Sequence, residues 1–159
     1  MNIRTATEAD FNSILNLVNT AFQVERFFKN QDRLTPGDLP SYFASGTFLV
    51  TEDEGRITGC IYVKRDRERA YFGLLSIDPS RQKTGLGRRL VAAAEEFARE
   101  TGAHFMDLRI INLREELPGI YAKLGYQVTG TEPYPTERNH VLTQPVHFIR
   151  MSKELGHRE

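Results

Sequence analysis

Hydrophobic and polar positions in the first quarter of the chain predict one strand followed by helices. The two kinds of residue alternate over residues 2–7, as in a short strand. From Phe11 to Phe22 apolar residues recur every three or four positions, which is the spacing of one helical face, and Thr7 precedes them as an N-cap. Over residues 24–45 this spacing is lost around a Pro-Gly turn, so one or two short helices are expected there.

The apolar runs that follow predict three consecutive strands. Residues 47–53 and 56–65 are expected to pair through a turn at Glu54 and Gly55, and the charged residues 66–69 form the tip of the next hairpin. Residues 70–78 are almost entirely apolar, as in a strand that is buried on both faces. Consecutive strands with short turns predict antiparallel neighbours.

The second half of the chain returns to alternating helices and strands. A helix with an apolar stripe from Leu90 to Ala98 is expected to end at Thr101-Gly102. The further elements expected are a strand at 104–111, a helix within 113–126, strands at 126–130 and 146–153, and a proline-rich loop at 131–145. The order of elements predicts an α+β fold with a mixed, mostly antiparallel sheet flanked by helices, in one domain over residues 1–156.

Composition limits the partners that this domain can attract. The chain has 159 residues, of which 40% are hydrophobic, and 21 basic residues balance 21 acidic residues. A net charge of zero gives no bulk attraction to nucleic acid or to an acidic membrane surface. No apolar run approaches the roughly 20 residues of a membrane span, and the single cysteine, Cys60, lies in an apolar stretch typical of the core. We expect a cytoplasmic protein without a metal site.

The stretch IDPSRQKTGLGRRL (77–90) has the features of an anion site. It links a predicted strand to a predicted helix, and the first N–H groups of a helix lack internal partners. Gly85 and Gly87 have no side chains, so that an anion could approach the backbone. Basic residues surround the two glycines: Arg81, Lys83, Arg88 and Arg89. These features indicate a phosphate or pyrophosphate site, although a simple tight turn would also use such glycines.

Two other phosphate-binding patterns are absent from the chain. No segment matches the G-x-x-x-x-G-K-[ST] loop, and Leu90 stands where the third glycine of G-x-G-x-x-G would be. The glycines also follow a third or fourth strand instead of the first. A nucleotide-binding or interaction domain is therefore the weakest of the functions considered.

The same stretch resembles the acetyl-CoA motif of the GCN5-related N-acetyltransferase (GNAT) superfamily. That motif, V-x-P-x-x-[RQ]-x-x-G-x-[GA], is matched from Ile77 to Gly87 with Ile in place of Val. A second segment, NLREELPGIYAKLGYQ (112–127), is similar to the family's later N…FYEKLGF element, and the resemblance spans residues 2–153. It implies an acetyl-CoA-dependent N-acetyltransferase with its cosubstrate in a cleft between two splayed parallel strands. The alternative is a non-catalytic acyl-CoA-binding or sensing domain.

The resemblance also implies which residues bind the cosubstrate. The backbone of Gln82, Lys83, Thr84, Gly85, Leu86 and Gly87, with Arg88 at the helix start, would hold the pyrophosphate. Leu75, Ser76 and Ile77 would pair with the pantetheine arm, and an amide at a bulge, that of Leu75 or Ser76, would stabilise the oxyanion. Asn112 would contact the cofactor near its thiol.

Tyr121 and Glu25 are the catalytic candidates that this resemblance implies. Tyr121 matches the position that serves the departing thiolate, either by a strong hydrogen bond or with a lowered pKa. Glu25 stands where the family lines the acceptor pocket, and His140 and His147 are further candidate bases. We expect segments 24–45 and 130–145 to bind the acceptor, a primary amine of a small molecule or a peptide. Domains of this kind are often homodimers.

Overall fold

The computed structural model describes residues 2–29, 31–135 and 141–156. The strands are β1 (Asn2–Thr5), β2 (Thr47–Asp53), β3 (Arg56–Asp66), β4 (Arg69–Ile77), β5 (Phe105–Ile111), β6 (Gln127–Pro133) and β7 (His147–Glu154). The α-helices are α1 (Phe11–Ala21), α2 (Leu39–Ser45), α3 (Leu86–Glu100) and α4 (Leu117–Ala122). Short 3-10 turns are η1 (Glu8–Asp10), η2 (Phe22–Glu25), η3 (Pro36–Asp38) and η4 (Pro79–Arg81).

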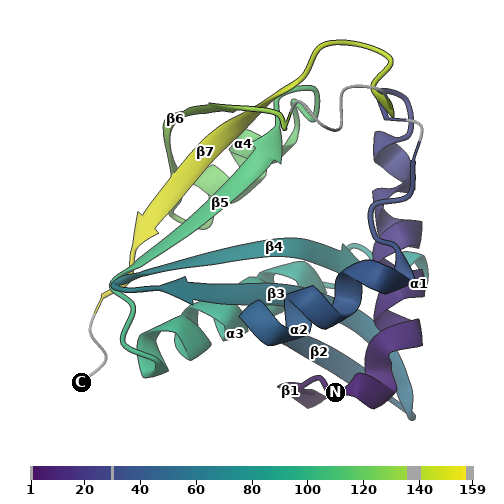
Figure 1. Cartoon of the computed structure of the whole chain (residues 1–159). Helices are drawn as coiled ribbons and strands as arrows, with labels where there is room; N and C mark the ends of the chain where they lie inside the picture. Colours follow the sequence, from purple (N-terminus) through teal and green to yellow (C-terminus); the bar gives the residue numbers. More distant parts are fainter. Residues whose placement is uncertain (1, 30, 136–140, 157–159) are drawn as a thin grey trace.

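One mixed sheet of seven strands organises the molecule, in the order β1-β2-β3-β4-β5-β7-β6. All neighbouring strands are antiparallel except β4 and β5, which are parallel. The parallel pair is joined only over Arg69–Tyr71 and Phe105–Asp107, and beyond these residues the two strands separate, as Figure 1 shows. The predicted α+β class and the splayed parallel pair are both confirmed.

Helices pack on both faces of the sheet because its strands alternate their apolar side chains between two cores. One core joins α3 and α4 to the sheet through Leu90, Ala94 and Tyr121 against Ile61 and Phe72. The other core places α1 and α2 over β2 and β3, and its members include Ile14, Val18, Leu39, Phe48 and Cys60. The sheet is therefore the middle layer, and the separation of β4 from β5 lies within this layer.

The last hairpin and the helix before it differ from the sequence prediction. Strand β6 continues to Pro133, whereas the sequence analysis placed 131–133 in a loop. The extension is tolerated because β6 is an edge strand, where the missing N–H of a proline costs little. Only Leu117–Ala122 within 113–126 is α-helical, since Pro118 occupies the first turn and Gly125 adopts a φ of 98°.

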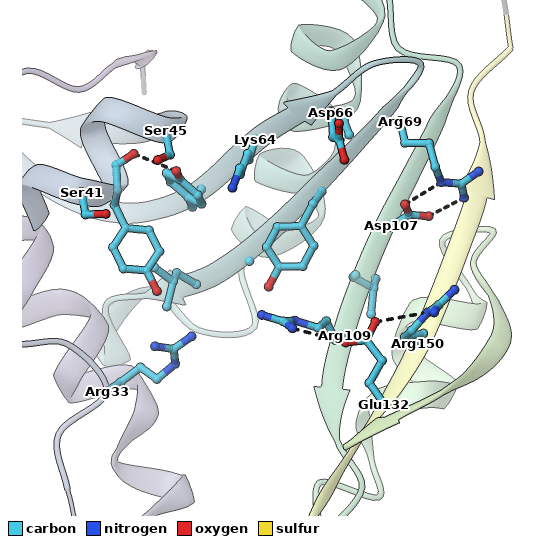
Figure 2. Close-up of a pocket in the computed structure, with 17 residues that line it drawn as sticks. Arg33, Ser41, Ser45, Lys64, Asp66, Arg69, Asp107, Arg109, Glu132 and Arg150 are labelled. Atoms are coloured by element: carbon cyan, nitrogen blue, oxygen red, sulfur yellow. Dashed lines mark hydrogen bonds and ion pairs between the residues drawn. The ribbon is translucent and has the colours of Figure 1, made fainter. Parts of the chain in front are cut away.

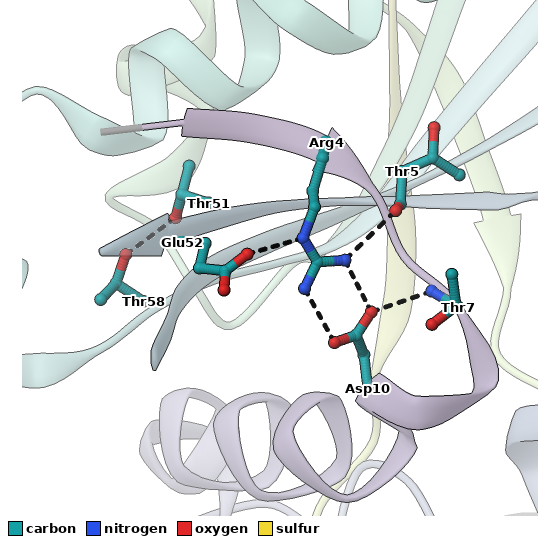
Figure 3. Close-up of polar contacts among 7 residues, drawn as sticks. All are labelled: Arg4, Thr5, Thr7, Asp10, Thr51, Glu52 and Thr58. Atoms are coloured by element: carbon teal, nitrogen blue, oxygen red, sulfur yellow. Dashed lines mark hydrogen bonds and ion pairs between the residues drawn. The ribbon is translucent and has the colours of Figure 1, made fainter. Parts of the chain in front are cut away.

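A charged cluster fixes the N-terminal strand to the start of α1 (Figure 3). Arg4 donates hydrogen bonds to both carboxylate oxygens of Asp10, at 2.8 and 3.0 Å, and its Nε donates to Glu52 at 2.7 Å. The backbone N–H of Thr7 donates to Asp10 Oδ2 at 2.9 Å. The bonds from Arg4 are the main cause that lowers the pKa of Asp10. The cluster joins β1, β2 and η1, the turn that precedes α1.

Two further observations bear on the sequence predictions. Within the described part of the chain, no helix combines the length and the apolar character that crossing a membrane requires. Cys60 is fully buried, as predicted, and burial raises the pKa of its thiol to about 12. This cysteine is therefore a protonated core residue and not a nucleophile.

Candidate active site

A β-bulge on β4 lies where the two parallel strands separate. Tyr62 pairs with Gly73 and Cys60 with Ser76, so that β4 has one extra residue at this point. Leu74 adopts a φ of 55°, a left-handed conformation that costs a leucine about 1–2 kcal/mol. Its carbonyl oxygen accepts hydrogen bonds from Ser76 Oγ at 3.0 Å and from Cys60 Sγ at 3.7 Å. Side chains thus hold a strained bulge in the place where one was expected.

A cavity of about 190 Å³ occupies the gap beside this bulge. Its two walls are Phe72–Leu75 on β4 and Leu108–Ile111 on β5. Tyr121 and Glu25, the two residues that the sequence marked as catalytic, both line it, although they are far apart in the chain. The fold therefore brings the predicted catalytic pair and the predicted oxyanion site into one enclosed space.

Tyr121 lies on α4 with its ring centroid 5.8 Å from that of Phe72. Burial raises the pKa of its hydroxyl to about 12, so the expectation that this pKa could be lowered is wrong. Full proton transfer from such a phenol to a thiolate with a pKa of about 8.5 would cost about 5 kcal/mol. Tyr121 can therefore serve as a hydrogen-bond donor that keeps its proton.

Glu25 ends η2 and is only 6% exposed. Its Oε2 accepts a hydrogen bond from Arg114 Nη1 at 3.1 Å. Burial raises the pKa of Glu25, and the positive charges of Arg114, Lys29 and Arg33 oppose that rise. A buried carboxylate with a raised pKa has the properties of a general base for an ammonium group.

The glycine turn forms a concave backbone surface at the start of α3. Lys83 and Gly85 have φ values of 64° and 84°, and Gly85 is the N-cap of the helix. A Cβ built on Gly85 or Gly87 meets nothing within 4 Å, so the backbone is open to a ligand. Leu86 is buried in the core and offers only its backbone. Left-handed residues before a helix N-terminus are typical of an anion-binding nest.

The basic residues around this turn differ in whether a carboxylate of the protein compensates their charge. Arg81 forms an ion pair with Asp53 at 2.8 Å, so its charge is compensated within the protein. Lys83 and Arg88, on either side of the two glycines, remain as the predicted phosphate contacts. The backbone geometry of the turn fits the CoA pyrophosphate, and the contributions of these side chains stay predictions.

Asn112 follows β5 and is partly used by the fold itself. Its Oδ1 accepts a hydrogen bond from the backbone N–H of His147 at 2.9 Å, and its own N–H donates to the His147 carbonyl at 3.0 Å. The side-chain NH₂ group makes neither of these bonds, so it is a donor through which the predicted cofactor contact of Asn112 could form. His147 is exposed and does not line the cavity, and His140 lies outside the described residues.

A groove of about 500 Å³ leads from the cavity across the face of the sheet (Figure 2). Tyr42, Tyr71 and Gly73 line both spaces, so the groove adjoins the cavity next to the bulge. Arg33 and Arg109 also line both spaces. Arg109 and Arg114 were not predicted from the sequence, because a charged residue on a strand or before a short helix is usually interpreted as solvent-exposed.

Comparisons with known proteins agree with this geometry. A family model described as an acetyltransferase (GNAT) domain matches residues 44–128. The chain belongs to the GNAT acetyltransferase family. It is an acetyl-CoA-dependent N-acetyltransferase, and the predicted enzyme class and cosubstrate are confirmed.

One relative of this GNAT protein and two solved structures with the same fold illustrate the similarity. The L-amino acid N-acyltransferase MnaT of Escherichia coli (strain K12) is 27% identical over 145 residues, which are 84% of this chain and 83% of MnaT. A structure of yncA from Salmonella typhimurium, solved with its cofactor acetyl-CoA, superposes with a TM-score of 0.76 at 21% identity over 100% of this chain and 96% of that one. The ribosomal-protein-S18-alanine N-acetyltransferase of Escherichia coli gives 0.78 at 14% identity, over 99% and 96%.

Proposed function

We propose that this enzyme transfers the acetyl group of acetyl-CoA directly to a primary amine of a small molecule or peptide in a ternary complex. The observation that carries the proposal is that Glu25 and Tyr121 line one cavity at the bulge of β4. Such a transfer needs two groups, one on either side of the thioester. One is a base that takes a proton from the amine, and the other is a hydrogen-bond donor to the departing thiolate. Cys60, the single cysteine of the chain, is buried in the core and does not line this cavity, so it is not placed to form an acyl-enzyme.

The chain's own backbone would orient the donor. The amides from Gln82 to Gly87 would hold the pyrophosphate, and Leu75–Ile77 would pair with the pantetheine arm beyond the bulge. The N–H of Leu75 or Ser76 would donate to the thioester oxygen as negative charge develops on it. Acetyl-CoA, when bound, supplies the activated acetyl group.

Glu25 and Tyr121 would then act at the two ends of the transfer. Glu25, whose carboxylate Arg114 contacts at 3.1 Å, would take the proton that the attacking amine loses. Tyr121 would donate a hydrogen bond to the sulfur of the departing CoA, since its raised pKa keeps the hydroxyl protonated. Both groups are buried, so that water competes little for these hydrogen bonds.

The names of two relatives support an amine on an amino acid or a peptide as the acceptor. One is named for L-amino acids, the other for an alanine of a ribosomal protein. The proposal extends to one catalytic domain over residues 1–156, acting in the cytoplasm as a homodimer without nucleic acid. Sedimentation or light scattering of the purified protein would check the dimer.

The proposal is tested by measuring thiol release from acetyl-CoA in the presence of a panel of primary amines. We expect at least one amine to accelerate thiol release and to appear as its N-acetyl product by mass spectrometry. The variants Glu25→Gln and Tyr121→Phe should bind acetyl-CoA as the parent does and turn over slowly. Tight acetyl-CoA binding without acetylation of any amine would favour the sensing function instead.

A further inference from the structure

The cavity beside the bulge concentrates positive charge in a protein that is neutral overall. Its ionisable lining contains one carboxylate, Glu25, against four cations: Lys29, Arg33, Arg109 and Arg114. Arg114 forms an ion pair with Glu25. Beyond that pair, the guanidinium groups of Arg33 and Arg109 add positive charge to the lining, and positive charge favours an anionic ligand.

The phosphates of CoA do not explain this excess. Their site at Lys83–Gly87 follows the far end of β4, whereas the cations gather near Tyr71 and Gly73. The seven strand residues from Tyr71 to Ile77 are separated by six steps, which span about 20 Å. The pantetheine arm that lies between the two regions carries no charge. The positive charge therefore faces the acceptor.

Arg109 belongs to a group in which two guanidinium groups share one carboxylate. Glu132 accepts contacts of 3.4 Å from both Arg109 and Arg150, which Figure 2 shows on the β5–β7 side of the groove. The trio therefore keeps one positive charge in excess. Contacts of this length are weak, so an incoming carboxylate could replace Glu132 at Arg109 without losing a strong ion pair.

Arg33 approaches the same opening from the segment between α1 and α2 (Figure 2). Its guanidinium lies over the ring of Phe22, 5.7 Å from the centroid. Across residues 2–29, 31–135 and 141–156, Arg33 makes no ion pair with a carboxylate. Stacking fixes the position of this half-buried guanidinium while its N–H donors stay available.

We propose that the acceptor is an amino acid whose carboxylate binds Arg33 and Arg109 at the junction of the cavity and the groove. This inference rests on the proposed function and narrows it to free amino acids, in contrast to peptides with a blocked carboxylate. The amino group then points to the bulge and Glu25, and the side chain extends into the groove between Tyr42, Tyr62 and Tyr71.

Size and charge both agree with this assignment. A cavity of about 190 Å³ is small beside ordinary ligand pockets of about 300–1,000 Å³, so that only a small part of an acceptor fits inside it. The surrounding cations also favour the neutral amine over the ammonium form, and the neutral amine is the form that attacks. The bound carboxylate offsets the repulsion that an ammonium group would otherwise meet.

The test compares L-amino acids with their matched amino acid amides, which have the same amine but no carboxylate. We expect kcat/KM with acetyl-CoA to favour the best amino acid over its amide by at least about 10-fold. Arg33→Gln and Arg109→Gln should each lower kcat/KM for the acid, mainly through KM, by roughly 10- to 100-fold more than they lower kcat/KM for the matched amide. Arg26→Gln is the matched control, because Arg26 pairs with Asp32 on the surface and lines neither space.

The outcomes separate the inference from the function on which it rests. Equal rates for acids and amides, or variants that slow both alike, would overturn the carboxylate site and leave the acetyltransferase function intact. Acetylation of amides or peptides but of no free amino acid would also overturn the carboxylate site and leave the acetyltransferase function intact. If acetyl-CoA binds and no amine is acetylated, the proposed function fails and this inference fails with it. Thermal melts of the variants identify any loss that comes from unfolding.

Discussion

Arg114 donates a hydrogen bond to Glu25 at 3.1 Å, across 89 residues of sequence. The bond joins η2, which follows the first helix, to the turn before α4, which carries Tyr121. It therefore sets two walls of the cavity relative to each other. Arg114 also contacts Glu116 at 3.0 Å, so its guanidinium is held from two sides. Arg114 is accordingly a positioning residue for the carboxylate.

Replacing Glu25 with Gln should lower kcat/KM for amine acetylation by roughly 10²-fold or more, because the base is lost while the hydrogen bond to Arg114 can remain. Burial raises the pKa of Glu25, so in the parent enzyme activity should fall on the acid side at a pH above the ordinary carboxyl value of 4.5. A pH profile of kcat/KM should show that step for the parent enzyme and lack it for Glu25→Gln. Glu116→Gln, which alters the exposed partner of Arg114, should keep the step.

The same substitution should not destabilise the protein at neutral pH. A carboxyl group whose folded pKa is raised favours the folded state below its unfolded pKa, and that contribution is lost as the pH rises through the folded pKa. The neutral Gln avoids this loss. The melting temperature of Glu25→Gln should equal or exceed that of the parent at pH 8, and the difference should shrink toward pH 4. A variant that melts lower at pH 8 would show that the Arg114 ion pair outweighs desolvation.

Removing the hydroxyl of Tyr121 should slow catalysis and spare binding. Tyr121→Phe keeps the ring contact with Phe72 and loses only the hydrogen bond to the sulfur, so kcat should fall by roughly 10²-fold while acetyl-CoA affinity stays within a factor of about 2. Stopped-flow and calorimetric titration measure the two quantities. Full activity of this variant on a true acceptor would remove Tyr121 from the mechanism.

Gly87 offers a cleaner test of the pyrophosphate site than Gly85. A side chain at Gly85 would be strained by its φ of 84°, whereas Gly87 has no such φ and a Cβ there meets nothing within 4 Å. Gly87→Glu should fold normally and weaken acetyl-CoA binding at least about 100-fold, since it places a negative charge at the phosphates. Gly119→Glu, on an equally open position of α4, is the control. If Gly87→Glu bound acetyl-CoA with unchanged affinity, the phosphates would have to bind at another site.

The N-terminal cluster should contribute stability that depends on pH. Asp10→Asn should lower the free energy of unfolding by about 1–3 kcal/mol at pH 7, because Arg4 loses a bidentate partner. The pKa of Asp10 is lowered in the folded state, so this contribution is present above the unfolded pKa near 3.8 and is lost as the pH falls through the folded value. Urea unfolding at pH 7 and at pH 3 measures the difference.

Asp38 provides the matched control for that experiment. Its carboxylate accepts the N–H of Thr35 at 2.8 Å, as Asp10 accepts that of Thr7, but no arginine of the described part of the chain pairs with it. Asp38→Asn should therefore cost less than about 1 kcal/mol. Equal effects of the two substitutions would assign the stability to the capping turn and not to Arg4.

The elements and the phosphate turn were predictable because local patterns encode them. Alternation and helical spacing mark the strands and α3, and a glycine such as Gly85 is favoured where φ is positive. The bulge at Leu74 was expected only from the family resemblance, since a leucine gives no signal for a left-handed φ.

The basic residues around the proposed acceptor site were not predicted, for a different reason. Arg33, Arg109 and Arg114 come from three separate segments, and each has the appearance of an ordinary surface residue in the sequence. Only the separation of β4 from β5 brings them to one cavity. Tertiary contact, and not local pattern, decides which charges face an acceptor.

The most direct test of this account is a crystal structure of the protein with acetyl-CoA. We expect the pyrophosphate on the amides of Gln82–Gly87 and the thioester oxygen within about 2.7–3.2 Å of the N–H of Leu75 or Ser76, with Tyr121 and Glu25 on either side of the acetyl group. An acetyl group that lies outside the space between β4 and β5, or out of reach of both amides, would contradict it.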